Sequence, residues 1–330
     1  MTLAASPALA GAIISFDAPG ATATTPQAVN ASGVVAGYYV DESDHYHSFI
    51  RAVDGTFTTF DEPQATKHKE HGTFAQSINS KGAVVGYYNR KGMHLLAGFL
   101  RTPDGKFKSF AATDVGLTFA RSVNARGVIA GDDTDATGFY HGFVRAADGT
   151  ITNFDAPGAG TSGAVGYGTF VSVINTLGAV AGSDLDSGGV EHGFVRNPDG
   201  TFATFDAPGA DTSSGHGTWV ESMNDDGAVA GYYSDSSNVY HAFVRAADGM
   251  FVTFDAPGAR GGTVATAIDS KGSAAGVFSA RGGIAKGFVR TAGGSFKTFI
   301  VNYQSIAVSG INNSRTVTGN SNSHGFVGNP

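Results

Sequence analysis

The sequence predicts an all-β protein: a seven-bladed β-propeller with four-stranded blades, whose ring closes when the N-terminal strand joins the last blade. Three observations support this prediction. The 330 residues include 48 Gly and 24 Phe but only eight Leu, a composition that favours sheet over helix. Two short motifs recur seven times along the chain. The chain also begins with a strand that belongs to no complete repeat and ends with a repeat that lacks its last strand.

The first recurring motif is Phe-Val-Arg or a near variant of it. Its Phe positions are Phe49, Phe99, Phe143, Phe194, Phe243, Phe288 and Phe326, and the last copy has Gly328 in place of Arg. The second motif is Asn-x-x-Gly after an apolar residue. Its Asn positions are held by Asn30, Asn79, Asn124, Asn175, Asn224, Asp269 and Asn312. The spacing of the Phe positions runs from 38 residues (Phe288 to Phe326) to 51 residues (Phe143 to Phe194), within the range typical of repeat folds.

Each repeat contains four short segments that read as strands. In the second copy they span residues 74–79, 83–88, 97–101 and 107–110. Asn-x-x-Gly predicts a tight turn between the first two strands, because Asn caps its own turn and Gly accepts a positive φ. Asp-Gly pairs such as Asp104-Gly105 predict the hairpin before the last strand. A parallel β-solenoid is the alternative, but its coils are much shorter than these repeats.

A histidine precedes the small residue and Phe of the first motif in five copies: His47, His141, His192, His241 and His324. Four of them have an Asp fourteen residues later, at Asp61, Asp155, Asp206 and Asp255. The two copies that lack the His, with Ala97 and Lys286 instead, lack the Asp as well. An Asp-Gly hairpin places such residues opposite each other, so we predict His–Asp contacts within the blades. His324 has no downstream strand, and the N-terminal strand 14–17 ends in Asp17, which we expect to be its partner. Repetition around a ring favours a scaffold role for these His, and for the repeated Arg, over a metal or acid–base role.

Composition and charge exclude several function classes. The net charge is 21 − 28 = −7, which argues against general binding to nucleic acid or anionic membranes. Without Cys there is no disulfide, thiol nucleophile or Cys-ligated metal. No apolar run approaches the length of a membrane span. We expect a monomer that forms one domain over residues 12–330. Residues 1–11 end in the small-x-small pattern Ala8-Leu9-Ala10 and suggest the remnant of an export signal, with a disordered Ala-rich end as the alternative.

Places where the repeats differ point to a candidate site. Three of the loops that lead into a first strand are long: 62–72, 156–168 and 207–217. They end in His71, Tyr167 and His216, which we expect at the mouth of the central channel. Next to them we expect four aromatic residues of the first strands, Phe74, Phe119, Phe170 and Trp219. Three residues before each Asn position lies a polar residue, and these form a predicted channel ring: Gln27, Gln76, Arg121, Ser172, Glu221, Thr266 and Ser309.

These residues suggest a small-molecule site. The predicted catalytic residues are His71, His216, Glu221, Arg121 and Tyr167, with His or a metal-bound hydroxide as the base. The predicted substrate-binding residues are Phe74, Phe119, Phe170, Trp219 and Gln76. His68, His71 and His216 are the candidate metal ligands, for a divalent ion such as Zn²⁺. The alternative is that the loop histidines are solvated and Arg121 forms a salt bridge with Glu221.

Two acidic segments carry the carboxylates that a Ca²⁺ site needs. Asp41, Glu42, Asp44 and His45 form one, and Asp132, Asp133 and Asp135 form the other. Both are predicted to lie in loops between the second and third strands, and we favour solvated turn residues over a Ca²⁺ site.

The run His241-Ala242-Phe243-Val244-Arg245, followed by Asp248-Gly249 and by residues 254–258 (Phe-Asp-Ala-Pro-Gly), resembles the HAF-type extracellular repeat family. The resemblance covers residues 13–327 and implies a bacterial exported β-propeller of extracellular or periplasmic location. It transfers no catalytic residue, because the family motif is the scaffold itself. We therefore expect one of two functions: a hydrolase of a small lactone, carboxylester or phosphotriester at the channel mouth, or a non-catalytic glycan- or protein-binding propeller.

Overall fold

The computed structural model describes residues 12–92, 95–160, 165–302 and 304–330. The predicted N-terminal segment 1–11 lies outside the described residues. Within the described ranges every regular element is a β-strand, so the all-β prediction is confirmed. No helix in this part of the chain is long and apolar enough to cross a membrane.

The 28 strands of the described residues form antiparallel groups of four, each consecutive in sequence except the last, which combines β26–β28 with β1. The first group is β2 (Ala23–Val29), β3 (Val35–Val40), β4 (Tyr46–Arg51) and β5 (Phe57–Phe60). The second is β6 (Thr73–Ile78), β7 (Val84–Asn89), β8 (Leu96–Arg101) and β9 (Phe107–Phe110). The third is β10 (Thr118–Val123), β11 (Ile129–Thr134), β12 (Tyr140–Arg145) and β13 (Ile151–Phe154). The fourth is β14 (Gly168–Ile174), β15 (Val180–Leu185), β16 (Glu191–Arg196) and β17 (Phe202–Phe205). The fifth is β18 (Thr218–Met223), β19 (Val229–Ser234), β20 (Tyr240–Arg245) and β21 (Phe251–Phe254). The sixth is β22 (Thr263–Ile268), β23 (Ala274–Ser279), β24 (Ala285–Arg290) and β25 (Phe296–Phe299). The remaining group is β26 (Ile306–Ile311), β27 (Val317–Ser321), β28 (His324–Gly328) and β1 (Ile13–Phe16).

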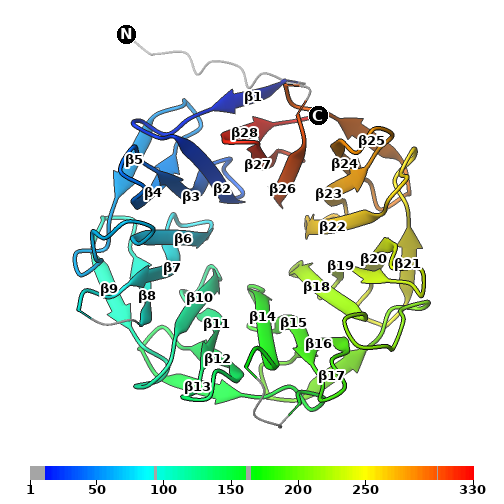
Figure 1. Cartoon of the computed structure of the whole chain (residues 1–330), viewed down its shortest axis with the longest axis horizontal. Coiled ribbons are helices and arrows are strands. Elements are labelled where there is room, and N and C mark those ends of the chain that lie inside the picture. The colour runs from blue at the N-terminus through cyan, green and yellow to red at the C-terminus, as the bar shows by residue number, and fades with distance from the viewer. Residues whose placement is uncertain (1–11, 93–94, 161–164, 303) are drawn as a thin grey trace.

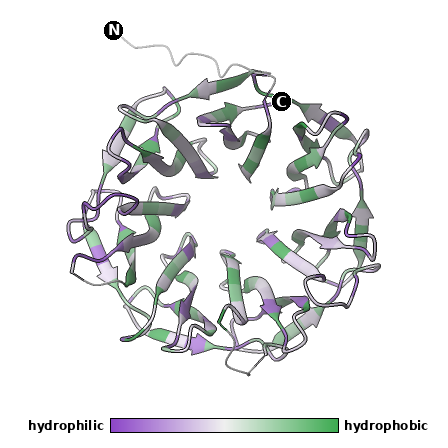
Figure 2. Cartoon of the chain, in the orientation of Figure 1, coloured by the Kyte–Doolittle hydropathy of each residue, from purple (hydrophilic) through white to green (hydrophobic). Residues whose placement is uncertain are grey.

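The groups are arranged radially, with the first strand of each innermost and the last strand outermost (Figure 1). Most groups are separate sheets, but β10–β13 and β14–β17 are joined through one parallel bridge between Tyr140 and Gly168. The four strands predicted for the second repeat differ from β6–β9 by no more than one residue at either end. Hydrophobic segments lie within the strands and hydrophilic ones are frequent in the loops (Figure 2).

The two ends of the chain share one sheet. β1 pairs antiparallel with β28, with Ile14 opposite Val327 and Phe16 opposite Gly325. His324 Nδ1 lies 3.0 Å from a carboxylate oxygen of Asp17, so the predicted contact between the two ends is confirmed. The other four predicted pairs are confirmed too, with Nδ1 to carboxylate distances of 2.7–3.1 Å at His47, His141, His192 and His241. These contacts hold β4, β12, β16, β20 and β28 to the segment that follows each last strand.

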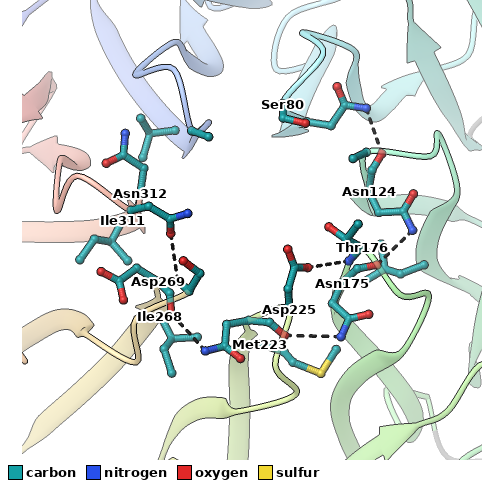
Figure 3. A pocket seen from close by; sticks show the side chains of 18 of the residues that line it. Ser80, Asn124, Asn175, Thr176, Met223, Asp225, Ile268, Asp269, Ile311 and Asn312 are labelled. Atoms are coloured by element: carbon teal, nitrogen blue, oxygen red, sulfur yellow. Dashed lines mark hydrogen bonds between the residues drawn. The ribbon is translucent and has the colours of Figure 1, made fainter. Parts of the chain in front are cut away.

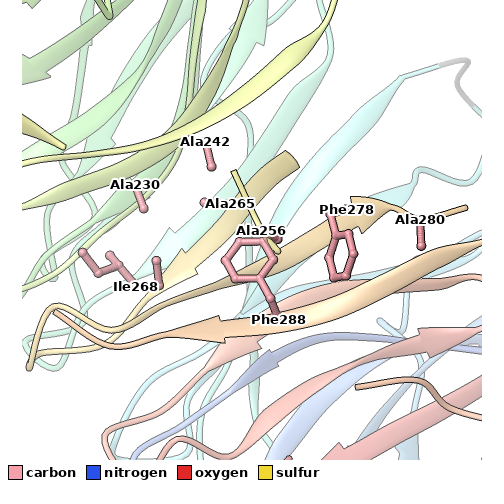
Figure 4. Close-up of a cluster of buried hydrophobic side chains, with 9 residues drawn as sticks. Ala230, Ala242, Ala256, Ala265, Ile268, Phe278, Ala280 and Phe288 are labelled. Carbon is pink, nitrogen blue, oxygen red and sulfur yellow. The ribbon is translucent and has the colours of Figure 1, made fainter. Parts of the chain in front are cut away.

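The hydrophobic core lies between neighbouring sheets. All seven Phe side chains of the Phe-Val-Arg motif are fully buried, which explains why this motif repeats. Between the β18–β21 and β22–β25 sheets, Phe288 packs among small residues such as Ala230, Ala242 and Ala265 (Figure 4). The alanines allow the sheets to approach closely, and the ring fills the space between them.

The repeated arginines also join neighbouring sheets. Each guanidinium lies 4.5–4.9 Å from the centre of a Phe ring on the last strand of the preceding sheet. Arg51 of β4 lies over Phe16 of β1 in the same way as Arg196 of β16 lies over Phe154 of β13. Such contacts contribute about 0.5–1 kcal/mol each at partly exposed sites. This agrees with the predicted scaffold role of these arginines.

A belt of side-chain amides surrounds one end of the channel, where the Asn-x-x-Gly turns meet (Figure 3). Each amide Nδ2 donates to the backbone carbonyl of the Asn or Asp at the same position in the next sheet. The donors are Asn30, Asn79, Asn124, Asn175, Asn224 and Asn312, at 2.9–3.4 Å. The bond from Asn312 to the carbonyl of Asn30 links the C-terminal sheet to the β2–β5 sheet.

Asp269 interrupts this belt. Its Oδ1 accepts from the N–H groups of Lys271 and Ser273, as the Asn copies do. Its Oδ2 stands where the others have a donor, is buried, and has no hydrogen-bond partner among the described residues. A carboxylate cannot donate to the carbonyl of Asn312.

We therefore predict that Asp269→Asn stabilises the protein by about 1 kcal/mol, because it supplies the missing donor and removes an unpaired buried oxygen. Urea unfolding of the variant and the native chain measures the difference. The matched control is Asn124→Asp, which removes the donor at another position of the belt. Its free energy of unfolding is expected to fall by at least as much as that of Asp269→Asn rises. A neutral or destabilising Asp269→Asn would contradict this account of the belt.

Candidate functional site

The predicted polar ring is confirmed as a structural feature, and β-bulges create it. In every first strand the pairing register shifts by one residue, and the residue left out of the ladder is the ring residue: Gln27, Gln76, Arg121, Ser172, Glu221, Thr266 and Ser309. A bulge leaves its extra residue unpaired and re-aims the side chain, and bulges are common next to active sites. All seven side chains line one cavity of about 390 Å³. The channel is therefore polar at its middle.

Arg121 does not pair with Glu221, so the salt bridge predicted as the alternative is wrong. Its Nε and Nη2 donate to the two carboxylate oxygens of Asp132 at 2.9 and 3.0 Å. Burial alone would lower the pKa of Arg121, but the charge and hydrogen bonds of Asp132 outweigh it and raise the pKa. The guanidinium also lies 4.7 Å from the centre of the Phe119 ring. Arg121 is thus a fixed, fully charged cation in the channel wall.

Glu221 is the second charged residue of the ring, and no cation lies beside it. Among the described residues its carboxylate makes no hydrogen bond or ion pair, and burial is the one influence on its pKa. Burial raises the pKa of Glu221 to about 7. A carboxyl group with this pKa can accept and release a proton at neutral pH.

Aromatic side chains form an arc beside the ring, two residues earlier on the first strands. The rings from Tyr46 to Phe170 make a continuous series of contacts with centroid distances of 4.7–6.2 Å, through Tyr38, Phe74, Tyr87, Phe119 and Tyr140. A second group contains Trp219, Tyr232 and Tyr240, with Trp219 stacked on Tyr232 at 5.1 Å. The predicted substrate-binding aromatics therefore lie in one layer of the molecule, while Gln76 lies in the channel cavity.

The three long loops end in the same geometry. The carbonyls of His71, Tyr167 and His216 accept from the N–H groups of Tyr46, Tyr140 and Glu191 at 2.8–3.0 Å. The next residue is always a Gly with positive φ. A Cβ at Gly72 would lie 1.8 Å from the carbonyl oxygen of Tyr46, so only Gly fits this crossing.

The predicted histidines are not part of the channel cavity. His71 lines a separate cavity between the start of β4 and the long loop 62–72, together with His45, His47 and Asp61. Its Nδ1 donates to the carbonyl of Lys69 at 2.8 Å. His216 Nδ1 lies 3.0 Å from Ser234 Oγ. The structure thus separates His71, His216 and Tyr167 from Arg121, Glu221 and Gln76, which it brings together.

The candidate metal ligands do not converge either. The rings of His68 and His71 have centroids 6.4 Å apart, and His216 lies in the loop before β18, across the channel from β6 (Figure 1). Within the described ranges no group of three or more His, Asp, Glu or Cys side chains is placed to hold a metal ion. The donor set therefore does not fit a bound Zn²⁺ or Ca²⁺.

The acidic segments are only partly in loops. Asp132 and Asp133 were predicted in a loop, but they lie in β11 and are buried, so that prediction is wrong. Asp132 lies opposite Phe119 in the strand pairing of β10 with β11, and this register places its carboxylate beside Arg121. Asp41 and Asp135 are turn residues whose Oδ1 atoms accept backbone N–H groups, as expected for solvated turns.

Two acidic residues were missed in the sequence. Glu191 begins β16, and burial, reinforced by the charge of Asp184, raises its pKa to about 7. Asp184 of β15 is fully buried, neither carboxylate oxygen has a partner among the described residues, and its pKa is raised to about 6, mainly by burial. Aligning the repeats would have found both, because Glu191 stands where other copies have Tyr46, Tyr140 and Tyr240, and Asp184 where they have Tyr39, Tyr88 and Tyr233.

Comparison with known proteins identifies the fold but no family. No protein-family model and no curated protein matches the sequence. Among solved structures, the chain is similar to a catalytically inactive virginiamycin B lyase from Staphylococcus aureus with quinupristin, at 14% identity and TM-score 0.62 over 96% of this chain and 98% of that one. It is similar to a streptogramin B lyase at 12% identity and TM-score 0.63, over 96% of each chain. TolB from Acinetobacter baumannii matches at 13% identity and TM-score 0.53, over 83% of this chain and 65% of that one. At these identities the likeness shows a β-propeller fold and nothing about activity.

Proposed function

We propose that this protein is an exported seven-bladed β-propeller, closed through the pairing of β1 with β28, and that it hydrolyses a small ester in its central channel. The seven-bladed, closed architecture is supported by the shared terminal sheet and by the hydrogen bond from Asn312 to Asn30. The substrate class is a lactone, carboxylester or phosphotriester. Two of the similar propellers are lyases, an example of catalysis on this fold.

The observation that carries the catalytic proposal is the contrast between the two charges of the ring. Arg121 is fixed by Asp132, whereas the Glu221 carboxylate has no partner and a pKa near 7. Holding an uncompensated charge in a half-buried site costs free energy, and a scaffold has no need of it. Such groups are candidates for acid–base catalysis.

In the proposed reaction Glu221 acts as the general base. It accepts a proton from a water molecule as the water oxygen attacks the carbonyl carbon or the phosphorus of the ester. Arg121 stabilises the negative charge that develops on the carbonyl or phosphoryl oxygen. When the bond to the leaving oxygen breaks, Glu221 returns the proton to that oxygen. No step is assigned to a metal ion, because the side chains present do not form a site for one.

A non-catalytic binding propeller is the second candidate, and the aromatic arc favours it. Stacked Tyr, Phe and Trp side chains beside a polar channel are suited to binding flat or sugar-like ligands. This candidate requires no turnover and no role for the proton of Glu221.

The test is a panel of lactones, carboxylesters and phosphotriesters, assayed with the native chain and with Glu221→Gln, in buffer with and without a chelator. Turnover by the native chain that survives the chelator and is lost in the variant supports the proposal. Equal turnover by both proteins would refute the role of Glu221. Absence of turnover for every member of the panel would favour the binding protein.

A further inference from the structure

Trp219 differs from Phe74, its equivalent in the second repeat, in the residues that the preceding sheet places beside it. The equivalent residue Phe74 has Tyr87 stacked on one side and contacts Tyr38 and Tyr46 of the preceding sheet at 5.4 and 4.7 Å. Trp219 has Tyr232 in the place of Tyr87. The residues of the preceding sheet that correspond to Tyr38 and Tyr46 are Ser183 and Glu191.

Backbone contacts place these two residues next to the start of β18. The N–H of Val220 donates to Ser183 Oγ at 2.9 Å, and the N–H of Glu191 donates to the carbonyl of His216 at 2.9 Å. A short hydroxyl side chain and a carboxylate therefore stand where Phe74 has two tyrosine rings. Among the described residues the aromatic contacts of Trp219 come only from Tyr232 and Tyr240 of its own sheet. Burial raises the pKa of Tyr232, and the charges of Glu221 and Glu191 add to this increase, so both carboxylates lie near the ring that stacks on Trp219.

The charge at this position is not balanced. Glu191 Oε2 is buried and has no hydrogen-bond partner in the described part of the chain. No Lys or Arg among the described residues forms an ion pair with Glu191 or Glu221, and the channel cation Arg121 is held by Asp132. Asp184 adds a further acidic group beside Glu191, and the charge of His192, when protonated, acts against it. The surroundings of Trp219 therefore favour a cation.

The molecule uses the same combination elsewhere with a cation of its own. In the β10–β13 sheet the Arg121 guanidinium lies 4.7 Å from the centre of the Phe119 ring and is bound by the Asp132 carboxylate. Phe119 and Trp219 hold equivalent positions in β10 and β18. At Trp219 the ring and the carboxylates are present and the cation is not supplied by the chain.

We propose that Trp219 and Glu191 bind a substituted ammonium group carried by the substrate. The face of an indole attracts such cations, and a nearby carboxylate adds a charge pair in a poorly hydrated place. The inference rests on the proposed function, because it places a cationic group of the ester two residues from Glu221. It narrows the substrate class to small esters that carry a tertiary or quaternary amine.

Choline chloride is the probe, and its neutral isostere 3,3-dimethylbutan-1-ol is the matched control. Trp219 is the only Trp of the chain, so its fluorescence reports on binding directly, and titration calorimetry provides an independent readout. We expect saturable binding of choline, at least about 10-fold weaker binding of the neutral alcohol, and a similar loss for choline in Glu191→Gln. Glu191→Gln removes an unpaired buried charge, so it should fold at least as well as the native chain, which circular dichroism verifies.

Equal binding of choline and the neutral alcohol, an unchanged affinity in Glu191→Gln, or no choline binding by either readout would each overturn the proposal. The result is independent of turnover. Choline binding without hydrolysis of any ester would leave the ammonium site standing and refute the hydrolase, and hydrolysis without choline binding would do the reverse.

Discussion

Glu221→Gln is expected to reduce kcat/KM for the ester substrate by about 10²–10⁴-fold and, at the same time, to make the protein more stable at pH 8. The loss of activity follows from the loss of the base, since Gln cannot accept the proton of the attacking water. The gain in stability follows from the pKa of Glu221, which burial raises from its usual range to about 7.

The sign of the stability effect is fixed by this direction. The unfolded chain ionises Glu221 near its ordinary pKa, whereas the folded chain resists ionisation until about pH 7. The native protein therefore loses stability as the pH rises between these two values, and the full cost is present above pH 7. Gln carries no such cost, so the variant should be more stable by about 1–3 kcal/mol at pH 8 and nearly equal to the native chain at pH 5. Urea unfolding at the two pH values measures both.

Glu62→Gln is the matched control for the stability effect. Glu62 is also buried, but its carboxylate accepts from Gln64 N–H and from Ser109 Oγ, both at 2.6 Å. Because these bonds stabilise the carboxylate, its replacement is expected to destabilise the fold and to leave kcat/KM unchanged. If Glu221→Gln instead lowered stability at pH 8 as Glu62→Gln does, Glu221 would have a partner and the catalytic argument would fail.

The second large effect concerns the joint between the chain ends. Phe16→Ala is expected to destabilise the protein by about 3 kcal/mol. Phe16 lies on β1, which is far in sequence from β26–β28, the other strands of its sheet. The ring of Phe16 packs against Phe49 and Phe57 at 6.2 and 5.8 Å and lies under the Arg51 guanidinium. Its loss removes these contacts, which join β1 to the neighbouring β2–β5 sheet.

Phe154→Ala is the matched variant for this measurement. Phe154 makes the same contacts, with Phe194 and Phe202 at 6.2 and 5.9 Å and with Arg196, but its strand follows its neighbours directly in the chain. If β1 is an integral strand of the terminal sheet, the two variants lose similar free energy of unfolding. A much smaller loss for Phe16→Ala would mean that β1 is only loosely attached, and the proposed closure would be wrong.

The strand order could be predicted because the repeats are alike. The fully buried Phe of each copy, the Asn-x-x-Gly turn and the His–Asp pairs are dictated by local chemistry that recurs, so each copy tests the others. The pairing of Asp17 with His324 could be inferred for the same reason. The extent of β11 could not, because Asp132 and Asp133 are polar residues in a strand, and their partners Arg121 and Asn153 lie on other strands.

The candidate site was predicted less completely. The polar ring could be predicted from its position relative to the Asn motif. The β-bulge that directs those side chains into one cavity could not, because no residue pattern within a single repeat marks it. The loop histidines were predicted as catalytic because imidazole is a common acid–base group. The backbone contacts at Gly72 and Gly217 instead direct the long loops onto the preceding sheets, away from the channel cavity. Glu191 was missed because it stands out only when the neighbours of Trp219 are compared with those of Phe74, where tyrosines occupy the positions of Ser183 and Glu191.

The most direct test of the proposed chemistry is a pH titration of the glutamate side-chain carboxyls by carbon-13 NMR, which requires no substrate. The chain has only five Glu, and Glu221→Gln and Glu191→Gln identify the two resonances of interest by their loss. We predict that both resonances titrate near pH 7. Titration of the Glu221 resonance near the ordinary glutamate value of about 4.3 would contradict the account, because the channel would then hold a well-solvated or well-paired carboxylate with no capacity to act as a base at neutral pH.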